Sequence, residues 1–136
     1  MAMVLNTGWT RLYFSLHPEI VYLLKIRKGS GEFFPFYVGM SETRSIGRLG
    51  DYISCQFNAS TDFNIGTALR RLVEKGYEFV VDYHLSENAR EEEARLIAEY
   101  RAKGLVLLNN ELHYDPKRTT SETQRERVHR FVDEHF

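Results

Sequence analysis

The sequence predicts an α/β fold of the α+β type, with a small central, mostly antiparallel, three-stranded sheet flanked by helices. Three β-branched or aromatic runs bounded by turn residues predict the strands, and apolar residues at helical spacing predict the helices. The length of 136 residues, of which 43% are hydrophobic, fits one compact domain with its own core.

The first two strands are expected to pair as a hairpin. Residues 20–26 and 33–38 are apolar runs, and the segment at 28–32 between them contains two glycines. Pro35 has no N–H for a ladder, so the second strand is expected to be regular only after it, or to turn that side to solvent. Gly39 is expected to end this strand.

Two helices are predicted between the hairpin and the third strand. Ser41 or Thr43 is a candidate cap for a helix that runs as far as Ile53. A polar stretch at residues 56–64 then precedes a second helix, whose apolar positions recur at helical spacing until Gly76.

The third strand and third helix follow directly. Residues 77–83 are rich in aromatic and β-branched side chains and predict the strand. Ser86 or Asn88 then opens a helix that closes at Gly104. Residues 105–108 are expected to return as a short strand or extended segment.

The chain is expected to divide into three parts: an N-terminal segment at 1–19, the main domain at 20–110 and a C-terminal helical extension at 111–136. In the extension, a capping-box spacing at residues 119–122 precedes Val128, Phe131 and Val132 at helical spacing. This apolar face is expected to pack on the same domain, or on a second copy in a homodimer.

Composition limits the kinds of partner, cross-link and compartment to be expected, but it does not select a function. The 18 basic and 19 acidic residues leave a net charge of -1, so nucleic-acid binding would depend on a local basic face. The single cysteine, Cys55, excludes an intramolecular disulfide framework. No apolar run suits a signal or membrane-spanning segment, so we expect a cytoplasmic protein with no membrane partner.

Several side chains suit phosphodiester hydrolysis, which needs a base, positive charge at the phosphate and activation of a water. Tyr22 and Tyr37 lie on strands expected to pair, so their phenols can meet on one surface. Arg48 and Tyr52 are four residues apart, which places them on one helix face. Glu93 interrupts an apolar helix face, where an unpaired charge is expensive.

Each of these residues also has an ordinary structural interpretation. Tyr22 and Tyr37 suit half-buried strand positions in a core. Arg48 suits a solvated helix face, and Glu93, which follows two other glutamates, suits an acidic first turn of a helix. The order of the motifs along the chain favours the functional interpretation.

Five short motifs carry that order. They are Ile20-Val21-Tyr22, Tyr37-Val38-Gly39, Arg48-Leu49-Gly50-Asp51-Tyr52, Glu93-Ala94-Arg95-Leu96-Ile97 and Leu108-Asn109. The series resembles the GIY-YIG nuclease superfamily, which has a GIY strand, a YIG strand, an arginine helix, a glutamate helix and a closing asparagine. Ile20 departs from the pattern, because the family has glycine there.

The resemblance implies a divalent-metal-dependent endonuclease of restriction, phage or mobile-element type, with DNA as the expected substrate. It implies one Mg²⁺ or Mn²⁺ ion held by Glu93, and a scissile phosphate bound by Arg48. Tyr22 is the expected general base, and Tyr37 and Tyr52 are expected to orient or contact the phosphate.

Further residues are expected to support such a site. Gly39 and Asn109 are structural residues near it, and Asn109 ties down the last segment of the main domain. A local basic face for nucleic acid is expected from these cations: Lys25, Arg27, Lys28, Arg44, Arg70 and Arg71. Arg44 is also a weaker rival to Arg48 for the phosphate.

Two alternatives to an active nuclease stay open at this point. The first is a nucleic-acid-binding module on the same fold with impaired catalysis, which Ile20 favours. The second is a structural or interaction domain unrelated to nucleic acids, which the near-zero net charge favours.

Overall fold

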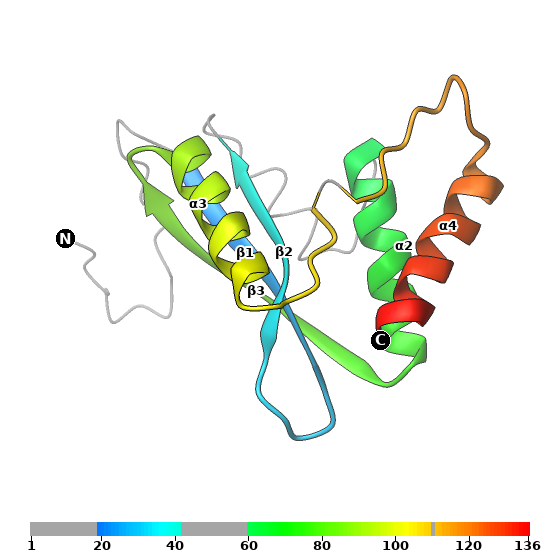
Figure 1. The fold of residues 1–136 in the computed structure, drawn as a ribbon, viewed down its shortest axis with the longest axis horizontal. Coiled ribbons are helices and arrows are strands. Elements are labelled where there is room, and N and C mark those ends of the chain that lie inside the picture. The colour runs from blue at the N-terminus through cyan, green and yellow to red at the C-terminus, as the bar shows by residue number, and fades with distance from the viewer. Residues whose placement is uncertain (1–18, 42–59, 110) are drawn as a thin grey trace, which may run out of the picture.

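The computed structural model describes residues 19–41, 60–109 and 111–136 (Figure 1). Along the chain the elements are β1 (Glu19–Lys28), β2 (Phe34–Ser41), α2 (Ser60–Glu74), β3 (Tyr77–Ser86), α3 (Ala89–Ala102) and α4 (Ser121–His135). The helix expected to run as far as Ile53 lies outside the described residues.

The three strands form one antiparallel sheet in the order β2-β1-β3. Strand β1 is therefore central and pairs along its length with both neighbours. Tyr22, near its start, lies opposite Gly39 on one side and Tyr83 on the other. The predicted α+β fold with a three-stranded antiparallel sheet is confirmed.

A β-bulge interrupts the pairing of β1 with β2. Leu24 pairs with Tyr37 and Lys25 pairs with Pro35, which leaves Phe36 as the extra residue. A bulge disturbs the alternation of side chains, and Phe36 and Tyr37 accordingly both contact the same hydrophobic cluster. Because β2 is an edge strand of this sheet, it accommodates a proline.

Three predicted boundaries were wrong. Strand β2 continues past Gly39 to Ser41, since β1 still offers it partners there. Helix α2 begins at Ser60, inside the stretch expected to be polar coil, where serine, threonine and aspartate favour a helix start. Strand β3 continues to Ser86, three residues beyond its predicted end.

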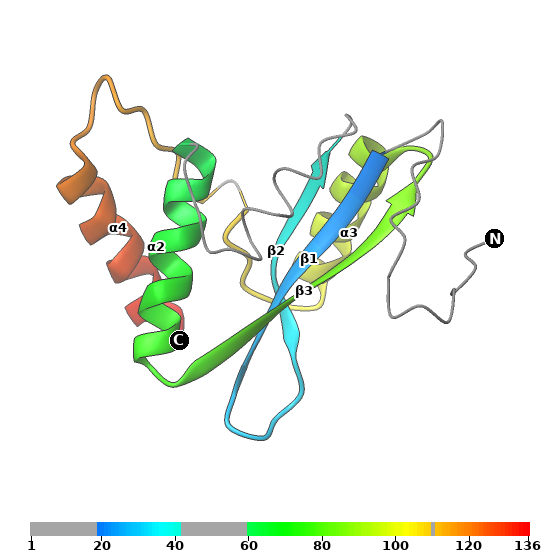
Figure 2. The ribbon, with the colours of Figure 1, turned by 180° about the vertical axis from the view of Figure 1, so that it is seen from behind.

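Two hydrophobic clusters lie on opposite faces of the sheet. The α2/α4 cluster has these buried members: Tyr22, Leu24, Ile26, Phe36, Ile65, Ala68, Leu69, Leu72, Leu108, Val128 and Val132. The α3 cluster has Val21, Val38, Ala89 and Leu107 at its centre, with Leu23, Met40, Leu96, Ile97 and Tyr100 against it. Figure 1 shows α3 in front of the sheet, and Figure 2 shows the sheet from behind with β1 in front of α3.

Helix α4 packs on its own domain, beside α2 in both views. Val128 and Val132 are fully buried in the α2/α4 cluster, and Phe131 packs against it. The final residue, Phe136, contacts the rings of Phe34, Phe36 and Tyr77 at centroid distances of 6.4, 5.5 and 6.0 Å. The proposal of a homodimer through this face is therefore wrong, because the face is already buried within the chain.

The start of α4 has a simple cap instead of the expected capping box. Thr120 is the N-cap, and its hydroxyl accepts a hydrogen bond from the backbone N–H of Thr123 at 3.2 Å. The reciprocal bond of a capping box would need glutamate or glutamine three residues after the cap, where this chain has Thr123.

A buried polar network joins α2, α4 and the segment between α3 and α4. The side chain of Gln124 is fully buried and donates to Asn64 Oδ1 at 2.9 Å, while Asn64 donates to the carbonyl of Leu112. Arg127 donates to Gln124 Oε1 at 3.2 Å. Because every partner is satisfied, the network fixes the segment without leaving an unpaired buried group.

In the described part of the chain, no helix is long and apolar enough to cross a membrane.

Candidate functional site

The first two motifs meet at the pair formed by Tyr22 and Gly39. The Tyr22 side chain belongs to the α2/α4 cluster and is only 2% exposed. A Cβ atom built on Gly39 would overlap Cε2, Cζ and Oη of the Tyr22 ring. Glycine is therefore required for the ring to lie across β2, which is a packing reason for tyrosine and glycine at these positions.

Asn109, in the fifth motif, binds the backbone of Val38 in the middle of the second motif. Asn109 Oδ1 accepts from the Val38 N–H at 2.8 Å, and Asn109 Nδ2 donates to the Val38 carbonyl at 2.6 Å. The backbone N–H of Leu108 also donates to the Phe36 carbonyl at 2.8 Å. The segment thus continues the ladder on the outer edge of β2, with the amide of Asn109 acting in place of backbone.

A residue that the sequence analysis missed holds this segment from the other side. Arg101, in the last turn of α3, donates to the Asn109 carbonyl and forms an ion pair with Glu111 at 3.1 Å. The only signal in the sequence is a basic residue near a helix end, which commonly reaches nearby carbonyl groups. Asn109 is consequently 5% exposed and fixed by both β2 and α3.

The three consecutive glutamates of α3 have different surroundings. Glu91 is exposed and accepts from the Asn88 side chain at 2.7 Å. Glu92 contacts His84 Nε2 at 2.6 Å, and hydrogen bonds from Ser86 and then His84 lower the pKa of this carboxyl. Glu93, the last of the three, is half-buried. Glu92 and Glu93 are therefore both partly shielded from solvent, whereas Glu91 faces it.

The tyrosines and Glu93 approach the sheet from opposite faces. Tyr22 and Tyr37 contact the α2/α4 cluster, whereas Leu96 and Ile97, one turn after Glu93, contact the α3 cluster. The structure thus brings Tyr22, Tyr37, Gly39 and Asn109 together around β2, and carries Glu93 on the helix across the sheet. Arg44, Arg48 and Tyr52 lie outside the described residues.

A metal site built from several protein ligands is not seen in residues 19–41, 60–109 and 111–136. No three histidine, cysteine, aspartate or glutamate side chains come together there. A magnesium ion that keeps several waters needs fewer protein ligands than such a group provides. Glu93 is the candidate carboxylate because of its place in the fourth motif and its half-buried position on α3.

The cations expected on the hairpin all contact side chains of the same domain. Lys25 forms an ion pair with Asp82 at 2.8 Å, and Arg27 one with Glu78 at 3.6 Å. The Arg27 guanidinium also lies 4.3 Å from the centre of the Phe33 ring. Lys28 Nζ lies 5.6 Å from the centre of the Tyr77 ring.

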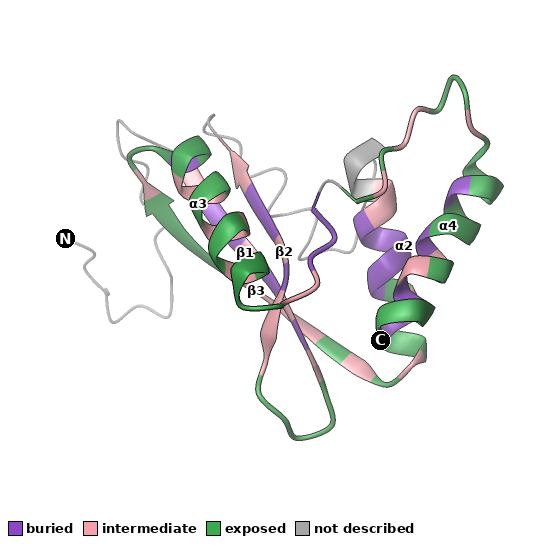
Figure 3. Cartoon of the chain, viewed as in Figure 1, coloured by how far each residue is buried: buried purple, intermediate pink, exposed green. Residues whose placement is uncertain are grey.

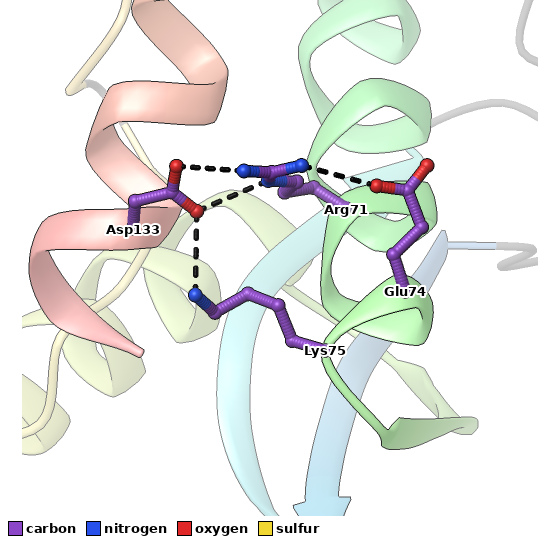
Figure 4. Close-up of polar contacts among 4 residues, drawn as sticks. All are labelled: Arg71, Glu74, Lys75 and Asp133. Atoms are coloured by element: carbon purple, nitrogen blue, oxygen red, sulfur yellow. Dashed lines mark hydrogen bonds and ion pairs between the residues drawn. The ribbon is translucent and has the colours of Figure 1, made fainter.

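The two arginines of α2 that were expected to bind nucleic acid, Arg70 and Arg71, lie in different environments. Arg70 is exposed, whereas Arg71 forms a two-pronged bond to Asp133 of α4 at 2.9 and 3.0 Å (Figure 4). Lys75 and Glu74 complete this group, at 3.3 Å from Asp133 and 3.2 Å from Arg71. The hydrogen bond from Arg71 is the main reason that the pKa of Asp133 falls from 3.8 to about 2. Arg71 therefore fastens α4 to α2.

Comparison with known proteins adds no relative to this geometry. No protein-family model, curated protein or solved structure matches the chain.

We predict that Gly39→Ala destabilises the domain by about 1–3 kcal/mol, the usual range for an overpacked core. The added methyl overlaps the ring of Tyr22, which is buried in the α2/α4 cluster. Urea unfolding measures the change. Gly31→Ala is the matched control, since its Cβ would meet only the Lys28 carbonyl at an ordinary 3.6 Å. Pairing Gly39→Ala with Tyr22→Leu should recover part of the loss, and purely additive effects would contradict the overlap.

We predict that Asp133→Asn makes the domain less sensitive to acid. The folded pKa of about 2 lies below the ordinary 3.8, so the carboxylate stabilises the fold above about pH 4. This contribution disappears as the pH falls toward 2. Melting temperatures from pH 6 to pH 2 should therefore fall less steeply for Asp133→Asn than for wild type. Glu134→Gln, on the neighbouring exposed residue, is the control, and identical slopes for all three proteins would refute the role of Asp133.

Proposed function

We propose that the chain is a divalent-metal-dependent endonuclease that hydrolyses phosphodiester bonds in nucleic acid, with DNA as the substrate. The observation that carries the proposal is the bidentate bond of Asn109 to Val38, across 71 residues of sequence. Together with the Tyr22 and Gly39 pair, it joins three of the five motifs around β2. These contacts hold the second motif in a fixed position beside Tyr22, which supports the proposal of a shared site.

The base in this proposal is a tyrosine of the hairpin. A free phenol titrates near pH ~10, so the phenolate needs a neighbouring positive charge to form at neutral pH. Tyr22 is the first choice because of its place in the first motif, although it is 2% exposed. Tyr37 is the alternative, since it is half-buried and the bulge at Phe36 alters its direction.

Arg48 and Glu93 supply the charges that hydrolysis needs. The planar guanidinium of Arg48 offers paired donors to the scissile phosphate. Glu93 is the carboxylate for one Mg²⁺ or Mn²⁺ ion, which would lower the pKa of a bound water and neutralise charge on the phosphate. Glu93 is half-buried, in the turn of α3 before Leu96 and Ile97, which contact the α3 cluster, and this position supports a role beyond solvation.

A catalytically impaired nucleic-acid-binding module on the same fold is the second candidate. The burial of Tyr22 favours it, because a base must reach the water from which it removes a proton. The placement of Tyr22 and of the Glu93 helix on opposite faces of the sheet also favours it, because hydrolysis would need both groups at one phosphate. Ile20 favours it as well, since it replaces the glycine of the first motif and fits a regular strand position between Ser41 and Leu85.

We predict that Glu93→Gln abolishes cleavage and preserves folding and nucleic-acid binding, because the amide is isosteric but does not replace a carboxylate ligand. Nicking of supercoiled plasmid in Mg²⁺ measures cleavage, and a gel shift in Ca²⁺ measures binding. Glu91→Gln is the matched control, as the same change on an exposed neighbour. Undiminished nicking by Glu93→Gln would refute the metal role of Glu93. A wild-type protein that binds nucleic acid but does not nick it would favour the impaired binding module.

We predict that Tyr22→Phe loses at least about 10²-fold in cleavage rate, the usual lower range for a general base, while stability changes by only about 1 kcal/mol. Tyr37→Phe, the same change on the paired strand β2, is measured under the same conditions as a matched comparison. Single-turnover rates with a labelled duplex separate chemistry from binding. An inactive Tyr37→Phe beside an active Tyr22→Phe would transfer the base to Tyr37.

A further inference from the structure

The second half of β3 presents a strand edge and an apolar surface to solvent. Within the described part of the chain β3 is an edge strand, since its only partner there is β1. Tyr83 and Leu85 are 56% and 52% exposed, and the side chains of Asp82 and His84 are 55% and 52% exposed. Figure 3 shows exposure along this end of β3. A long, exposed edge is a template for pairing with another strand.

The side chains of this edge are sorted by face. Val81 contacts the α2/α4 cluster, so Tyr83 and Leu85 lie on the same face, two and four residues further along the strand. Asp82 and His84 point to the other face, where they contact Lys25 and Glu92. Tyr83 and Leu85 are two of the three large hydrophobic residues that are exposed in the described part of the chain, and the third is Val73.

This segment is complementary to itself when read in the antiparallel direction. A two-fold axis perpendicular to the sheet at Tyr83 places Asp82 opposite the partner's His84, and Val81 opposite the partner's Leu85. Each acidic side chain then faces a basic one, the exposed Tyr83 faces its own copy, and the exposed Leu85 faces the half-buried Val81. Moving the axis to Asp82 or to His84 would instead pair each of these residues with its own copy. The register centred on Tyr83 is therefore the favoured one.

We propose that residues 81–85 pair with the same residues of a second copy, forming a two-fold dimer with a continuous six-stranded sheet. The interface is isologous, which is the usual arrangement in homodimers. It covers the exposed Tyr83 and Leu85 and leaves the α4 face buried in its own domain. A pair of short strands is a small interface, so the dissociation constant is expected in the micromolar range.

Charge-swapped variants test the register directly. Asp82→His and His84→Asp each place two like side chains opposite each other, twice per dimer, and each should weaken association by roughly tenfold or more. In a mixture of these two single variants every acidic residue again faces a basic one, so association should return as a heterodimer. Sedimentation equilibrium of the full chain, from about 1 to about 300 µM, spans the expected range.

Control variants distinguish loss of pairing at the β3 edge from loss of folding. Lys25→Met removes the intrachain partner of Asp82 without altering the edge, and should leave association unchanged. Tyr83→Lys places two lysines across the axis and should give a folded monomer, as checked by circular dichroism. A wild-type chain that stays monomeric, a dimer unaffected by Tyr83→Lys, or a mixture that fails to associate would each overturn the proposal. A monomer that binds nucleic acid through Tyr83 would also overturn it, by assigning the edge to that ligand.

Discussion

Burial of β1 on both faces is the constraint on which the rest of the fold depends. Val21 contributes to the α3 cluster, and Tyr22, Leu24 and Ile26 contribute to the α2/α4 cluster, all with 2% exposure or less. A slip of one residue would exchange the two sets, so two separate cores fix the register of β1. The position of Gly39 beneath the Tyr22 ring is a consequence of that register.

Periodicity predicted the fold because the elements of this chain have distinct patterns. The strands are rich in aromatic, β-branched and other apolar residues, and α3 has both a cap at Asn88 and a stop at Gly104, which has a φ of 83°. The boundaries that failed depend on tertiary contacts. Strand β2 extends to Ser41 because β1 is there to pair with it, and this partner is not apparent from local sequence.

The candidate site was predictable in its residue types and only partly in its geometry. Helical spacing places Glu93 on the inner face of α3, as local periodicity can. The bond between Asn109 and Val38 is different, because its partner is backbone, and backbone carries no residue-specific signal. The opposite faces occupied by Tyr22 and Glu93 likewise follow from how helices cover the sheet, which a list of motifs does not contain.

Three of the cations expected to form a basic face pair with carboxylates of their own domain, and this pairing bears on nucleic-acid binding. Lys25, Arg27 and Arg71 each have a carboxylate of their own domain within 3.6 Å. Exposed pairs of this kind are worth only about 0–1 kcal/mol, so a phosphate can replace the carboxylate at small cost. Each exchange, however, leaves the displaced carboxylate uncompensated beside the phosphates, which reduces the net charge neutralised. Binding through these residues would therefore depend less on salt than the number of cations alone implies.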